Sequence, residues 1–265
     1  MSSTLNIFFV GDIVGKPGLD LTETLLRSYL EKYSVDLCIA NGENLSDGKG
    51  ILSEDAERLF SLGVRVITGG NHTWDKWQTR KLLARENRIL RPLNYPKENP
   101  GLGFTIVDVE GKGKVGVLNL QGRTFMQTID CPFKAAEWAY NKIKVQTPVI
   151  LLDFHAEATA EKIAMAWYLD GRVSAIIGTH THTPTADARI LPEGTAYITD
   201  VGMTGPYDSV IGMKKDIAIR RFINQTPFKY ETASHDARFC GVFVQVDTQT
   251  GKALRFEQVI FPAFQ

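Results

Sequence analysis

The chain has 265 residues, of which 43% are hydrophobic, so it can bury a sizeable core in one large domain or at most two. Lysine plus arginine and aspartate plus glutamate each number 30, so the formal net charge is zero. This balance disfavours a long nucleic acid as the main partner, because such binding relies on a basic face.

Cysteine usage and the N-terminal sequence predict a cytoplasmic protein. Cys38, Cys131 and Cys240 lie far apart and form no CxxC motif, which is typical of reduced thiols. The opening MSSTLNIFFVGD lacks a positively charged segment, and its apolar run is too short for a signal peptide. No stretch approaches the ~20 apolar residues that a membrane helix needs, so no membrane association is expected.

Short β-branched apolar runs alternate with helix-period segments along the first part of the chain. The expected strands are NIFFV (6–10), DLCIA (36–40), VRVIT (64–68), VILLD (149–153) and SAIIG (174–178). The expected helices are residues 18–33, 53–62, 75–86, 132–144 and 157–169. Between them, residues 91–103 are rich in Pro, Asn and Gly and indicate an ordered loop between two halves of one domain, residues 1–265.

After Asp187 the pattern changes to a more antiparallel set of strands, with one helix near residues 212–223. The expected strands there are TAYITD (195–200), FKYETA (228–233), CGVFVQVD (240–247) and LRFEQVIF (254–261). The alternation before Asp187 favours α/β architecture with buried strands. The whole chain is therefore predicted to form two sheets of mixed strand direction, packed face to face with helices outside.

Polar residues with ligand chemistry follow five of the apolar runs, at or just beyond the carboxyl end of each. They are Asp12, Asn41, Glu43, Asn44, Asn71, His72, His155, His180 and His182. In open α/β sheets, ligands bind in the crevice outside those strand ends. We therefore expect these side chains to converge on one site.

Two of the five histidines, His180 and His182, share the short segment GTHTH. In an extended segment residues i and i+2 point the same way, so the pair would present both imidazoles to one side. An isolated H-x-H is also compatible with two polar loop residues. Likewise Asn71 could cap a helix beginning near Thr73, whereas in an extended segment the adjacent Asn71 and His72 would face opposite sides.

The candidate residues combine oxygen and nitrogen donors, which suit borderline metals such as Mn, Fe, Zn and Co. They outnumber the ligands that one ion needs. Two ions about 3.5–4 Å apart would use them, and such pairs usually share a bridging carboxylate. The H-x-H segment could then place one imidazole on each ion.

The order GD … NGEN … GGNH … H … GTHTH resembles the calcineurin-like metallophosphoesterases, whose usual blocks are D-x-H, GDxxD, GNH[DE], H and GHxH. Two departures stand out: Val14 occupies the place of the first-block histidine, and Glu43 in NGEN replaces the second-block aspartate. Both departures resemble one bacterial branch whose members hydrolyse 2′,3′-cyclic nucleotides. The segments GDIVGKPG, HAE, THTHTPTAD and DVGMTGPYDSVIGM also resemble that branch, over nearly the whole chain.

The resemblance implies a four-layer α/β sandwich and a site with two metal ions, Fe or Mn first, with Zn and Co as alternatives. The implied ligands are Asp12, Asn44 and His182 for metal 1, Asn71, His155 and His180 for metal 2, and Glu43 as the bridge. It implies that His72 gives a proton to the leaving oxygen. A hydroxide bridging two dications is nucleophilic near neutral pH, and histidine suits the donor role there.

Further residues carry weaker expectations. Asp153, Glu157 and Asp187 are candidates for orienting the imidazoles. Arg123, together with the loop at residues 202–212, is a candidate for shaping the substrate pocket. His235 has no motif around it and is expected to have a structural role.

The sequence thus predicts a dinuclear phosphodiesterase for small cyclic nucleotides, with 2′,3′-cyclic nucleotides favoured. The partner would be a small phosphodiester, and a homo-oligomer is compatible with the sequence. Two alternatives stay open: phosphomonoesterase or nuclease action with the same metals, and a metal-binding regulatory protein with weak activity.

Overall fold

In the computed structural model, which describes residues 4–264, the first sheet has seven strands in the order β2-β11-β12-β1-β3-β4, with β13 paired to β12. Their bounds are β1 Thr4–Val10, β2 Asp12–Ile13, β3 Leu37–Asn41, β4 Val64–Thr68, β11 Met203–Pro206, β12 Ala237–Asp247 and β13 Ala253–Phe261. Strands β1, β3 and β4 run parallel, whereas β12 is antiparallel to β1 and β13. The sheet is therefore mixed, as predicted.

The second sheet has six strands within residues 4–264, in the order β5-β6-β7-β8-β10-β9. Their bounds are β5 Phe104–Val109, β6 Gly113–Gln121, β7 Ile150–His155, β8 Ala175–Thr179, β9 Arg189–Ile190 and β10 Ala196–Ile198. Strands β6, β7, β8 and β10 run parallel, and β5 and β9 close the edges antiparallel. This second sheet is mixed as well.

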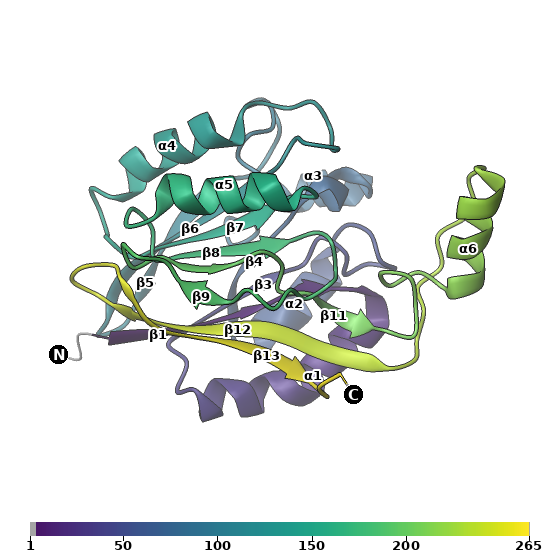
Figure 1. Cartoon of the computed structure of the whole chain (residues 1–265), viewed down its shortest axis with the longest axis horizontal. Coiled ribbons are helices and arrows are strands. Elements are labelled where there is room, and N and C mark those ends of the chain that lie inside the picture. The colour runs from purple at the N-terminus through teal and green to yellow at the C-terminus, as the bar shows by residue number, and fades with distance from the viewer. Residues whose placement is uncertain (1–3, 265) are drawn as a thin grey trace.

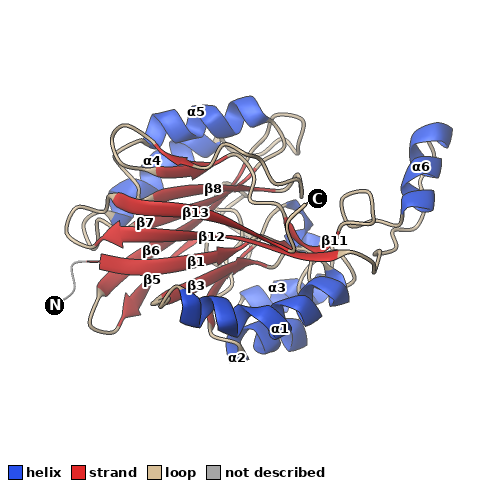
Figure 2. Cartoon of the chain, turned by 60° about the horizontal axis from the view of Figure 1, so that its bottom comes forward, coloured by secondary structure: helices blue, strands red, loops and turns tan. Residues whose placement is uncertain are grey.

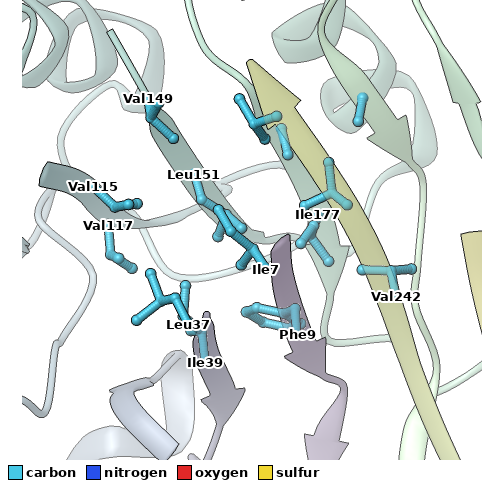
Figure 3. Close-up of a cluster of buried hydrophobic side chains, with 14 of the residues drawn as sticks. Ile7, Phe9, Leu37, Ile39, Val115, Val117, Val149, Leu151, Ile177 and Val242 are labelled. Atoms are coloured by element: carbon cyan, nitrogen blue, oxygen red, sulfur yellow. The ribbon is translucent and has the colours of Figure 1, made fainter. Parts of the chain in front are cut away.

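The space between the two sheets holds the central core (Figure 3). Ile7 and Phe9 of β1 point into it and meet Leu151 and Ile177 from the second sheet. The intervening Phe8 belongs to a different cluster, because successive side chains of a strand point to opposite faces. Each strand of this kind packs on both faces, which explains its continuous apolar sequence.

Helices cover the outer faces of both sheets, as Figures 1 and 2 show. Helices α1 (Gly15–Lys32), α2 (Ser53–Ser61) and α3 (Trp77–Leu83) pack on the first sheet, and α4 (Pro132–Ile143) and α5 (Thr159–Leu169) pack on the second. The predicted four layers are confirmed. No helix in the described part of the chain is long and apolar enough to cross a membrane.

Helix α6 (Lys215–Asn224) is different, because it stands away from the sheets at the end of an arm (Figures 1 and 2). It buries only Ala218 and leaves Phe222 and Ile223 exposed. The helix confirms the prediction at 212–223, but the sequence pattern did not place it outside the packed layers.

Three local predictions were wrong. Residues 228–233 form no strand and contribute only an isolated bridge between Thr232 and Met213, because this segment belongs to the arm rather than a sheet. The segment TAYITD was expected in an antiparallel set of strands, but its strand β10 pairs parallel to β8. Helix α3 is shorter than the predicted 75–86, because residues 75–76 form a bend and residues 84–85 form a turn.

The structure also contains an unpredicted hairpin, β5–β6, which follows the loop at residues 91–103. That loop is ordered: the Arg91 guanidinium donates to the carbonyls of Pro92 and Leu93 at 2.8 and 3.1 Å. It carries the chain from the first sheet to the second, as predicted for a connection between two halves.

Candidate metal centre

The candidate residues lie where the parallel strands of both sheets end. Asp12 follows β1, Glu43 follows β3, and Asn71 follows β4, all in the first sheet. In the second sheet, His155 ends β7 and His180 directly follows β8. Because the carboxyl ends of parallel strands meet at one edge, residues far apart in sequence come together there.

Three ligand-type atoms surround the Nε2 nitrogen of His155. Glu43 Oε1, Asn71 Oδ1 and His180 Nδ1 each lie 3.0 Å from it. A ring nitrogen carries at most one hydrogen, so it cannot satisfy all three neighbours. Glu43, His155 and His180 could together hold a metal ion, since their donor atoms all lie within 4.8 Å of one another.

A second group of atoms meets the first at Glu43. The Asn44 side-chain amide lies 3.1 Å from Glu43 Oε1 and 3.1 Å from His182 Nε2. His182 Nε2 in turn lies 3.9 Å from Asp12 Oδ1. The oxygen and nitrogen of an asparagine amide are interchangeable by a flip, so Asn44 can turn its oxygen to a cation.

Asp12 carries a buried oxygen with no hydrogen-bond partner. The side chain is fully buried, and among the described residues Oδ1 accepts no hydrogen bond. Such an orphaned carboxylate oxygen is costly in a protein interior unless a positive charge compensates it. A cation bound between Asp12 and His182 would compensate it, so the donor set fits a metal site.

The three imidazoles share a further feature of metal-bound histidines. Each directs one ring nitrogen into the cluster and the other toward an oxygen, which fixes the ring and its tautomer. The outer contacts are His155 Nδ1 with Thr179 Oγ1 at 2.9 Å, His180 Nε2 with Glu157 Oε2 at 3.0 Å, and His182 Nδ1 with the Ile211 carbonyl at 2.9 Å.

The expectations for the orienting carboxylates are thus partly met. Glu157 contacts His180 directly, and Asp153 acts on His155 through Thr179, whose hydroxyl donates to Asp153 Oδ1 at 2.7 Å. Asp187 instead accepts hydrogen bonds from Thr185 and Thr199, so its expected contact with an imidazole was wrong.

Asn41 supports the site from behind. Its amide donates to Asp153 Oδ2 at 2.9 Å, and its side-chain oxygen accepts from the backbone N–H of Glu43 at 3.1 Å. It therefore connects the loop that carries Glu43 to the strand that carries His155.

Charge in the cluster is distributed by burial and by proximity. Burial raises the pKa of Asp12 well above its usual range. For His155, burial alone would lower the pKa, but the charge and hydrogen bond of Glu43 and the charge of Asp12 raise it to about 9. Burial, aided by the positive charge of His155, lowers the pKa of His180 to about 2. A protonated His155 thus supplies positive charge that a metal ion would replace.

His180 and His182 reach the site by a different backbone from the predicted one. Strand β8 ends at Thr179, and both histidines have positive φ, 97° and 62°. The two imidazoles therefore converge through a left-handed turn and not through the alternation of an extended segment. Such conformations persist only where surrounding contacts impose them.

A buried ion pair imposes this turn. Lys162 Nζ on α5 donates to the Thr179 carbonyl at 2.7 Å and to Asp200 Oδ2 at 2.8 Å. Asp200 Oδ2 also accepts from the backbone N–H and the hydroxyl of Thr181 at 3.0 and 2.8 Å. The Lys162 and Asp200 side chains are each only 1% exposed. Neither residue was predicted, although a lysine on the apolar face of a helix is a usable signal.

His72 lies on the 3-10 turn η1 (Asn71–Trp74), so the extended geometry expected for Asn71 and His72 was wrong. Its backbone N–H donates to Glu43 Oε2 at 2.9 Å, and its Nδ1 lies 2.9 Å from Asp75 Oδ2. Asp75, three residues later in GGNHTWD, was missed by the sequence analysis. With Nδ1 facing Asp75, Nε2 is the nitrogen that remains for a ligand.

A cavity of about 780 Å³ opens beside the cluster and is lined in part by Glu43, His72 and His182. Arg123 is not among its lining residues, and its backbone N–H donates to Glu161. A role for Arg123 in substrate binding therefore stays a prediction. His235 is exposed and lies outside the cluster, and its expected structural role stays a prediction.

Comparison with known proteins identifies relatives along nearly the whole chain. The family described as YmdB-like protein matches residues 8–259. A 2′,3′-cyclic-nucleotide 2′-phosphodiesterase of Bacillus subtilis is 45% identical, with 97% of each chain covered.

Two solved structures also resemble the chain. A protein of Thermus thermophilus has a TM-score of 0.91 at 39% identity, over 97% of this chain and 99% of the other. A structure described as a novel phosphatase from Mycoplasma pneumoniae has a TM-score of 0.92 at 36% identity, over 98% and 94%. These similarities confirm the resemblance to metallophosphoesterases that the motifs indicated.

Replacing Lys162 by Met tests the support of the histidine turn. The substitution leaves Asp200 buried without its cation, and breaking a buried pair costs about 3–5 kcal/mol. We expect a lower melting temperature and, after incubation with Mn²⁺, less bound metal per folded chain by elemental analysis. Arg27→Met, which removes an exposed pair with Glu31, is the matched control and should change neither quantity. Unchanged stability and metal content in Lys162→Met would contradict the anchoring role.

Proposed function

The chain belongs to the YmdB-like protein family of metallophosphoesterases, and on this basis we propose that it is a dinuclear metal-dependent phosphodiesterase acting on small cyclic nucleotides. The preferred substrates would be 2′,3′-cyclic nucleotides, the class in the name of the Bacillus subtilis relative. One observation supports a centre with two metal ions: two groups of donor atoms meet at the single oxygen Glu43 Oε1.

The two groups correspond to two metal positions. Asp12, Asn44 and His182 would hold metal 1, and Asn71, His155 and His180 would hold metal 2, with Glu43 shared between them. The orphaned Asp12 oxygen and the three fixed imidazoles support this assignment. Mixed carboxylate, amide and imidazole donors favour Fe or Mn and are compatible with Zn or Co.

When bound, two such ions supply a water-derived nucleophile at neutral pH and neutralise charge on the phosphoryl group. The chain itself supplies the proton for the leaving oxygen. His72 lines the cavity, and Asp75 at its Nδ1 would favour a proton on that nitrogen, which leaves Nε2 to give a proton to the leaving oxygen. The backbone contact from His72 to Glu43 keeps this donor beside the metal positions.

The five-membered ring of a 2′,3′-cyclic phosphate is strained, so its ground state lies closer to the transition state. Phosphomonoesterase action with the same residues is the second candidate, since the Mycoplasma pneumoniae relative is described as a phosphatase. Nuclease action and a regulatory role with weak activity are further outcomes that the same experiment separates.

A substrate panel tests the activity. With Mn²⁺ added to the purified protein, we expect faster hydrolysis of 2′,3′-cyclic AMP than of 3′,5′-cyclic AMP, 5′-AMP or a short RNA. Removal of metal with EDTA should abolish turnover, and Mn²⁺ should restore it. Preference for the monoester, the RNA or the 3′,5′ isomer would contradict the proposed substrate class, and metal-independent turnover would contradict the proposed mechanism.

Replacing His72 by Ala tests the proton donor. We expect both metals to stay bound, because His72 is not a proposed ligand, while the rate on 2′,3′-cyclic AMP falls by about 10²–10⁴. The rate on bis-p-nitrophenyl phosphate should fall much less, because p-nitrophenolate leaves without a proton. The exposed His235→Ala is the matched control and should leave both rates unchanged. An equal loss on the two substrates, or loss of metal, would show that His72 is not the proton donor.

A further inference from the structure

The cavity beside the metal centre is lined by two chemically different sets of residues, each called one half of its lining. One half consists of the cluster residues already described, with His180 and His182 at its wall. The other half is lined by the apolar or aromatic side chains of Val210, Met213, Phe222 and Tyr230. Hydrolysis of a phosphodiester needs only the first half, so the second half is available to the remainder of the substrate.

Helix α6 turns one face toward the cavity. Ala218, Arg221, Phe222 and Gln225 line it, at spacings of three, one and three residues, which places them on one side of a helix. Ile223 is not among the lining residues and is 74% exposed on another side. The arm therefore presents Phe222 to the cavity, although this ring is itself 71% exposed.

Tyr230 forms a fixed wall of the same half. Its ring packs against Gly48, where an added Cβ would lie 2.4 Å from Tyr230 Cε1, and Gly48 has a φ of +80°. A side chain at Gly48 would therefore displace the ring. Lys49 Nζ lies 5.9 Å from the ring centroid. Gly48 and Lys49 belong to the loop that begins with the proposed ligands at Glu43 and Asn44, so the wall and the metal centre share one segment.

We propose that this half of the cavity is a nucleobase subsite, in which the heterocycle of the substrate lies against the rings of Tyr230 and Phe222 while the cyclic phosphate reaches the metal centre. The subsite rests on the proposed function and adds recognition of the nucleoside to it. Aromatic side chains bind bases by stacking, and the cavity volume of about 780 Å³ falls in the range of small-molecule sites. Because every base has a π-face, purines and pyrimidines should both bind.

The test compares a nucleotide with a base-free substrate that has the same five-membered phosphodiester. Phe222→Ala and Tyr230→Leu should each raise KM for 2′,3′-cyclic AMP at least about fivefold. With glycerol 1,2-cyclic phosphate, kcat/KM should stay within about twofold of the wild type, because no base is present to stack. Ile223→Ala, next to Phe222 on the same helix, is the matched control and should change neither KM for the nucleotide nor kcat/KM for the base-free substrate.

Equal losses of kcat/KM on both substrates would overturn the proposed subsite. An unchanged KM for the nucleotide would overturn it too, as would an effect of Ile223→Ala as large as that of Phe222→Ala. Failure of the proposed function gives a different result, namely no turnover of either cyclic phosphodiester by the wild type. In that case calorimetry with adenosine 2′-monophosphate and the Mn²⁺-loaded protein decides the matter. If this nucleotide binds the wild type and its binding weakens at least about fivefold in Phe222→Ala, the result supports the subsite. If the wild type does not bind the nucleotide, the subsite is overturned.

Discussion

Buried carboxyl groups at the strand ends are the constraint on which the rest of this structure depends. Asp12, Glu43 and Asp153 are all at most 1% exposed, and Asp12 Oδ1 has no hydrogen-bond partner among the described residues. A buried charge without compensation destabilises a fold by several kcal/mol. The neighbouring imidazole of His155 offers one positive charge, and a pair of metal ions would offer more. These carboxyl groups and imidazoles therefore form a site that could hold cations.

Three of the four layers of the sandwich contribute to this site. The first sheet supplies the proposed carboxylate and amide ligands, and the second supplies the proposed imidazole ligands, so the cluster depends on the packing of the two sheets. Behind the second sheet, Lys162 of α5 extends through the interior to Asp200 and fixes the turn that carries His180 and His182. A helix on the outer surface is thus connected to the proposed metal ligands through Thr179 and Asp200, and preorganisation of this kind sets the geometry of a metal site.

The sequence predicted the convergence of polar residues because each of five apolar runs ends in one, and ligands of open α/β sheets bind outside the carboxyl ends of the strands. It could not predict the left-handed turn at His180 and His182, since that turn depends on Lys162 and Asp200, which are 38 residues apart. The sequence analysis also missed the β5–β6 hairpin, whose partly buried strand β5 alternates weakly. The helix α6 was predicted, but its position on an arm was not, because amphipathic periodicity does not indicate which part of a protein a helix packs on.

Anomalous diffraction from crystals of the protein loaded with Mn²⁺, together with elemental analysis of the same sample, tests the proposed dinuclear centre most directly. Two anomalous peaks are expected about 3.5–4 Å apart, with the Glu43 carboxylate between them and the Asp12 oxygen on the ion that His182 binds. A single ion, or ions bound outside the cluster of Glu43, His155 and His180, would contradict the proposed centre.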